Sequence, residues 1–69
     1  MRIRWEDGFQ IGCHAGEGQV IISANREGLV SLANILADLA DQTPSSHVHL
    51  DEHNSLEDGS CELIVQKTE

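Results

Sequence analysis

Aromatic and basic side chains are scarce in this chain. Its 69 residues include one Trp, one Phe and no Tyr, and only four Lys and Arg against twelve Asp and Glu, for a net charge of −8. Single-stranded nucleic acids bind to aromatic platforms in basic grooves, and a surplus of negative charge repels any phosphate backbone. We therefore expect no nucleic acid and no membrane surface as a partner, whereas a basic protein surface would be attracted.

Long apolar runs and paired cysteine motifs are also missing. No stretch approaches the ~18 consecutive apolar residues of a membrane span, and no apolar run follows the charged start at residues 1–6. Cys13 and Cys61 are far apart in the sequence and neither belongs to a CxxC motif, which argues against a zinc knuckle or a redox site. We expect a cytoplasmic protein whose two cysteines are small core residues.

Motifs for catalysis are absent as well. A chain of this length forms a single domain over residues 1–69 and buries only about 60% of its unfolded surface, which disfavours a deep active site. No Gly-x-Ser-x-Gly motif occurs, and the glycine-rich residues 12–18 lack the Gly-Lys-Ser/Thr of a phosphate-binding loop. We therefore expect neither enzyme activity nor a cofactor.

The hydrophobic pattern predicts five short strands and one helix. Apolar residues alternate with polar ones in five segments, and their spacing changes to three and four residues in one segment. The predicted strands are residues 2–6, 9–13, 19–24, 47–51 and 61–66, and the predicted helix is 25–41. The predicted fold is α+β: two layers, with one helix packed on a mostly antiparallel sheet of about five strands in the order β-β-β-α-β-β.

Two local features refine this prediction. If Ile3, Trp5 and Phe9 share one face, Trp5 lies opposite Phe9, and residues 6–8 form a three-residue loop with Gly8 at positive φ rather than a two-residue turn. Asn25 is a suitable helix cap, and Gly28 permits the helix to approach the sheet closely. The predicted buried stripe of the helix, flanked by Ile35, is Leu29, Leu32, Ala33, Leu36, Leu39 and Ala40.

The alternation also assigns a face to each strand residue. Val20, Ile22, Val48 and Leu50 are predicted to face the helix, which leaves the opposite sheet face uncovered because there is only one helix. That uncovered face is predicted to carry Arg2, Arg4, Gln10, His14, Ile21, Ser23, His47, His49, Asp51, Glu62 and Ile64. If Ile21 and Ile64 are neighbours, they form the apolar centre of a homodimer or a partner interface.

A His-x-His-x-Asp segment gives the strongest signal for metal binding. His47, His49 and Asp51 alternate along one strand, so their side chains project from the same side, and His53 or His14 would be additional ligands. A metal site needs three or four ligands that converge on one point, which this spacing alone does not guarantee. The alternatives are solvated histidines and histidines that contact a protein partner.

Two sequence runs resemble a known family. Residues 20–29 (VIISANREGL) and residues 47–65 (HVHLDEHNSLEDGS, then ELIV) resemble immunity protein thirty-two, a family of small bacterial proteins predicted to neutralise polymorphic toxins. The resemblance covers about residues 18–66 and implies that the chain binds a cognate protein toxin. Many such toxins are nucleases with basic clefts, which an acidic surface would complement. The predicted binding residues are His47, His49, Asp51, Glu52, His53, Glu57 and Asp58.

Two other functions remain open at this stage. One is a small metal-binding domain that uses His47, His49 and Asp51. The other is a homodimeric structural or regulatory module that associates through the uncovered sheet face.

Overall fold

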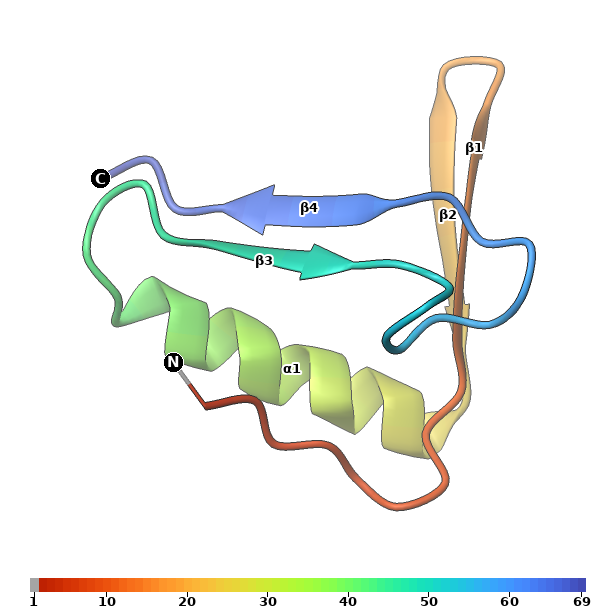
Figure 1. The fold of residues 1–69 in the computed structure, drawn as a ribbon, viewed down its shortest axis with the longest axis horizontal. Helices are drawn as coiled ribbons and strands as arrows, with labels where there is room; N and C mark the ends of the chain where they lie inside the picture. Colours follow the sequence, from red (N-terminus) through yellow and green to blue (C-terminus); the bar gives the residue numbers. More distant parts are fainter. Residues whose placement is uncertain (1) are drawn as a thin grey trace.

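A computed structural model describes residues 2–69. Within that range lie one helix and four strands: β1 (Ile11–Gly16), β2 (Gln19–Ala24), α1 (Arg26–Ala40), β3 (His47–Leu50) and β4 (Leu63–Gln66). β1 pairs with β2 and β3 pairs with β4, both antiparallel, in two separate sheets. Figure 1 shows β3 and β4 running beside α1, while the β1–β2 hairpin stands across one end of the helix. The fold is α+β, but the prediction of one sheet with about five strands is wrong.

The predicted first strand, residues 2–6, forms no ladder with another strand. It runs along α1 instead (Figure 1), where the Glu6 backbone N–H donates to Ser31 Oγ over 2.8 Å. Near the C-terminal end of the helix, the Arg4 guanidinium lies 3.2 Å from the Asp38 carboxylate. The alternation was a correct indication of an extended segment, but its backbone contacts a helix side chain rather than a neighbouring strand.

The turn after this segment is also tighter than predicted. The Phe9 N–H donates to the Glu6 carbonyl over 3.2 Å, so Asp7 and Gly8 are the two central residues of a β-turn. Gly8 has φ +80°, as predicted, but the three-residue loop is wrong. Trp5 and Phe9 nevertheless meet, with their ring centroids 4.5 Å apart. In a hairpin, the pairing of the two strands fixes the loop length that places given residues on one face. That rule does not apply to this turn because the segments on either side of it do not pair as strands.

The start of α1 follows the sequence prediction closely. Asn25 caps the helix, since its Oδ1 accepts from the Gly28 N–H over 2.8 Å and from the Gln10 N–H over 3.0 Å. At Gly28, a Cβ atom would lie 2.5 Å from the Gln10 carbonyl oxygen, so the close approach predicted for this glycine is confirmed. The helix ends at Ala40 with Asp41 as its C-cap, near the predicted boundary.

The buried face of α1 differs from the predicted stripe. Leu29 and Leu36 are 55% and 49% exposed, whereas Ser31 is fully buried because its hydroxyl accepts from the Glu6 N–H and donates to a helix carbonyl. Residues 2–6 run along the Ser31 side of the helix, so this polar position is covered. The buried helix residues are Gly28, Ser31, Ile35 and Leu39.

The core is formed by α1, the base of the β1–β2 hairpin, the inward face of β3 and one loop residue. Val48 and Leu50 are buried, as predicted, but Val20 and Ile22 are 66% and 43% exposed, so their predicted inward orientation is wrong. The β1–β2 hairpin contributes to the core only near its base, because its outer half extends beyond the helix. The buried apolar residues are Ile11, Cys13, Ile35, Leu39, Val48, Leu50 and Leu56.

The two hairpins are joined through the second edge of β1. The Glu57 N–H donates to the Ile11 carbonyl and the Cys61 N–H donates to the Cys13 carbonyl, both over 2.9 Å. This brings the two free thiols together, with their Sγ atoms 3.4 Å apart. Cys13 is buried, as predicted, and Cys61 is half-buried.

Candidate functional site

The outward face of the β3–β4 hairpin carries the polar residues predicted for it. His47 and His49 are exposed while Val48 and Leu50 between them are buried, as the period of two requires. His49 pairs with Ile64 of β4, and Leu50 pairs with Leu63. One step further along, the same antiparallel register places Asp51 and Glu62 on the outward face beside His49.

Three side chains converge on this face. His49 Nε2 lies 3.3 Å from Glu62 Oε2 and 3.6 Å from Asp51 Oδ2, and the three ligand atoms all lie within 4.8 Å of one another. His49 and Glu62 are well exposed, and Asp51 is half-buried. Chemically, this group can bind a cation or donate and accept hydrogen bonds at a protein surface.

The loop that follows β3 is held in one conformation by its own hydrogen bonds. The Asp51 carbonyl accepts from the Leu56 N–H over 2.8 Å, while Asp51 Oδ1 accepts from the His53 and Asn54 N–H groups over 2.9 and 3.1 Å. Leu56 is buried in the core and anchors the middle of the loop. Its acidic side chains are therefore presented from a fixed backbone.

This region has a strong excess of negative charge. Residues 47–62 contain five carboxylates and no Lys or Arg. Lys67 follows β4, but its ammonium group donates to the Ala40 and Gln42 carbonyls, each over 2.7 Å. We call the following set the acidic surface: His47, His49, Asp51, Glu52, His53, Glu57, Asp58 and Glu62.

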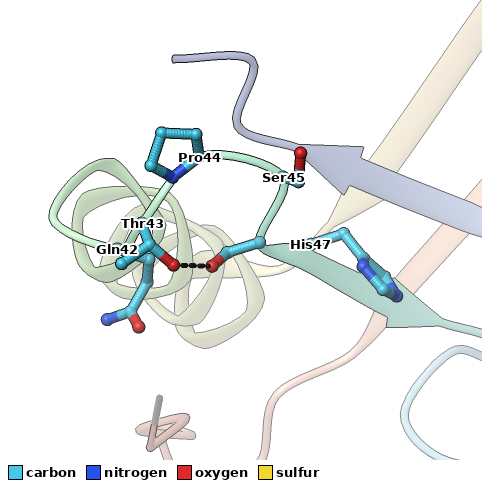
Figure 2. A pocket seen from close by; sticks show the side chains of 6 residues that line it. Gln42, Thr43, Pro44, Ser45 and His47 are labelled. Carbon is cyan, nitrogen blue, oxygen red and sulfur yellow. Dashed lines mark hydrogen bonds between the residues drawn. The ribbon is translucent and has the colours of Figure 1, made fainter.

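The histidines named from the sequence lie in different surroundings. His47 lines an open hollow between the end of α1 and the start of β3, together with Gln42 and Pro44 (Figure 2). A Thr43–Ser46 hydroxyl contact of 3.3 Å crosses this hollow. His14 lies on β1, opposite Ile21, and therefore on the other sheet. Of the predicted metal ligands, His49 and Asp51 are brought together, and His47 is not part of their group.

Glu62 is the site residue whose role sequence reasoning missed. Alternation placed it on the uncovered face, but its contact with His49 depends on which strand lies beside β3 and in which register. The sequence therefore predicted the sheet face on which Glu62 lies, but not that β4 pairs with β3 and so places Glu62 beside His49.

Exposed apolar side chains occur on both sheets. Val20, Ile21 and Ile22 of β2 are 66%, 52% and 43% exposed. Ile64 is 55% exposed on β4 and so belongs to a different sheet from Ile21. The two isoleucines are not neighbours on one continuous sheet, and a homodimer through them stays a prediction.

Comparison with known proteins gives one match. The family model described as Immunity protein 32 matches residues 19–68, which is more than half of the chain and spans the elements from β2 to β4. Comparison with curated proteins and with solved structures finds no match. Among the described residues, no helix combines the length and apolar character needed to cross a bilayer.

Proposed function

The chain belongs to the Immunity protein 32 family, and we propose that it binds and neutralises a cognate bacterial toxin through its acidic surface. The family match is the observation that supports the immunity role. Charge and loop geometry support the choice of surface. The proposed mechanism is binding: the acidic surface covers the active site of the toxin or a region beside it, and substrate is excluded.

The chemistry of the acidic surface favours a basic partner. Five carboxylates with no neighbouring Lys or Arg in residues 47–62 produce a negative field that would accelerate encounter with a basic cleft. The clefts of nucleases are basic because they bind phosphates, so a nuclease is the toxin class we propose. In the complex, carboxylates of the immunity protein occupy positions that substrate phosphates would otherwise take.

Within this surface, Glu57 and Asp58 are proposed as direct contacts. Both side chains are exposed, and the Glu57 backbone is fixed by its hydrogen bond to the Ile11 carbonyl. Glu52 has a different role, because its Oε2 accepts from the Gly59 N–H over 2.8 Å and so closes the loop. A loop that is already ordered loses little conformational entropy on binding.

Binding kinetics test the choice of surface. The toxin domain encoded by the neighbouring gene, in a catalytically inactive form, is immobilised, and association of the immunity protein is followed at low and high salt. Reversing two charges with Glu57→Lys/Asp58→Lys is expected to lower the association rate at least about tenfold at low salt. The control Glu17→Lys/Glu69→Lys makes the same change in net charge outside residues 47–62 and is expected to have a much smaller effect. Equal rates for the two double variants would contradict the assignment.

Protection of cells tests the immunity role itself. The active toxin is expressed in a sensitive host with the wild-type protein or with either double variant. Wild type and the Glu17/Glu69 variant are expected to restore growth, and the Glu57/Asp58 variant is expected to lose protection. If wild type gives no protection, the immunity proposal fails. If all three proteins protect equally, the role stands but the surface is wrong.

A further inference from the structure

The arrangement of His49, Asp51 and Glu62 within the acidic surface also supports an inference that does not rest on the proposed toxin binding. The three side chains come from both arms of the β3–β4 hairpin, and both carboxylates approach the same imidazole nitrogen, His49 Nε2. Each offers an atom that binds transition metals, and these atoms lie within 4.8 Å of one another. We propose that they form a binding site for one divalent transition-metal ion of the Zn²⁺ type.

The distances fit shared coordination better than direct ion pairing. A charge-assisted N–H···O hydrogen bond is about 2.7–2.9 Å long, whereas His49 Nε2 lies 3.3 Å from Glu62 Oε2 and 3.6 Å from Asp51 Oδ2. Two ligands bound tetrahedrally to Zn²⁺, each at about 2.1 Å, are separated by about 3.4 Å. The two measured separations lie on either side of that value. The carboxylate oxygens of Asp51 and Glu62 lie within 4.8 Å of each other, and the exposed Glu62 side chain is free to rotate to shorten this separation.

The backbone orients two of the ligands before any ion arrives. Asp51 Oδ1 accepts from the His53 and Asn54 N–H groups, which leaves Oδ2 directed toward His49. His49 lies within β3, where its partner in the β4 ladder is Ile64. Hydrogen bonds that fix a ligating carboxylate in this way raise metal affinity by preventing its rotation.

The ligand set selects the kind of metal. Imidazole favours Zn²⁺ and its neighbours over Mg²⁺ or Ca²⁺, which prefer sites composed entirely of oxygen ligands. Three protein ligands leave the remaining coordination position to water at this exposed surface. The surrounding carboxylates, including Glu52, attract the cation electrostatically.

Isothermal titration calorimetry of tag-free protein with Zn²⁺ tests the site. Protein treated with a chelator and then dialysed is expected to bind one equivalent. With Co²⁺ as the probe, the visible absorption of the bound ion is expected to be that of a four-coordinate complex. His49→Asn and Glu62→Gln are each expected to weaken Zn²⁺ binding at least about tenfold.

Matched controls separate this site from non-specific binding. His53→Asn removes a more exposed imidazole nearby, and Glu57→Gln removes one negative charge from the same surface, so both are expected to stay within about twofold of wild type. Circular dichroism is used to check that all four variants are folded. Absence of Zn²⁺ binding in wild type, or equal losses in the control variants, would overturn the proposal. Toxin binding by metal-free protein would leave the proposed function intact in either case.

Discussion

Replacement of Gly28 by alanine gives a sharp test of how the helix meets the β1–β2 hairpin. Alanine is normally more favourable than glycine inside a helix by about 1 kcal/mol. At this position, however, the added Cβ would lie 2.5 Å from the Gln10 carbonyl oxygen and 2.9 Å from Ile11 Cγ1. Ordinary carbon contacts begin at about 3.5 Å, so the helix or the segment at Gln10 must shift by about 1 Å.

The segment that would have to move is firmly held. The Gln10 carbonyl accepts from the Asn25 N–H over 3.2 Å, and the Gln10 N–H donates to Asn25 Oδ1 over 3.0 Å. Overpacking of this kind costs about 1–3 kcal/mol, and weakening of a backbone hydrogen bond adds about 1 kcal/mol. After the helix-propensity gain is subtracted, Gly28→Ala is expected to lower the free energy of unfolding by about 1–3 kcal/mol.

Urea denaturation followed by circular dichroism measures this loss. The matched control is Ala33→Gly at an exposed position of the same helix, which is expected to cost about 1 kcal/mol from propensity alone. Two opposite substitutions in one helix are thus both expected to destabilise the protein. If Gly28→Ala were more stable than wild type, the close approach of α1 to Gln10 would be refuted.

Three further predictions concern stability. Asn25→Ala removes the helix cap and two more side-chain hydrogen bonds, and is expected to lower the free energy of unfolding, measured by urea denaturation, by about 2 kcal/mol. Asn25→Asp keeps the acceptor oxygens and is expected to retain most of the wild-type stability. Ser31→Ala leaves the Glu6 N–H without its acceptor and is expected to cost about 1–3 kcal/mol, with faster hydrogen exchange at the Glu6 amide; unchanged exchange would contradict that contact. Burial, followed by the hydrogen bond and charge of Cys61, raises the pKa of Cys13 above its ordinary value of 9.0, so the folded state retains this proton more firmly than the unfolded state. The free energy of unfolding is therefore expected to fall as pH rises above 9.0, with a smaller slope in Cys13→Ala, and equal slopes in urea titrations would count against this.

Local signals predicted the helix and the exposed face of β3 correctly. The Asn25 cap and the end of α1 near Asp41 both depend on residues within a few positions of one another. The same is true of the alternation that buries Val48 and Leu50 while exposing His49. Side chains alternate along a strand and repeat along a helix with a fixed period, so such features can be predicted directly from the order of residues.

Packing between distant segments was harder to predict. Alternation cannot distinguish an extended segment that pairs with a strand from one that runs along a helix, so residues 2–6 were placed in a sheet that does not include them. For the same reason, Ser31 was not expected in the core, because its burial depends on a partner 25 positions earlier, Glu6. The exposure of Val20 and Ile22 likewise follows from where the hairpin crosses the end of the helix.

The sequence by itself determined the acidic character of residues 47–62, the position of its helix, and which side of β3 carries the histidines. Only the tertiary structure decided that Glu62 stands beside His49 and Asp51, and that the five strands expected in one sheet are replaced by two hairpins. The physical reason is range. Periodicity and capping act between residues close in the chain, whereas strand partners and registers are selected by the packing of segments that meet only after the chain has folded.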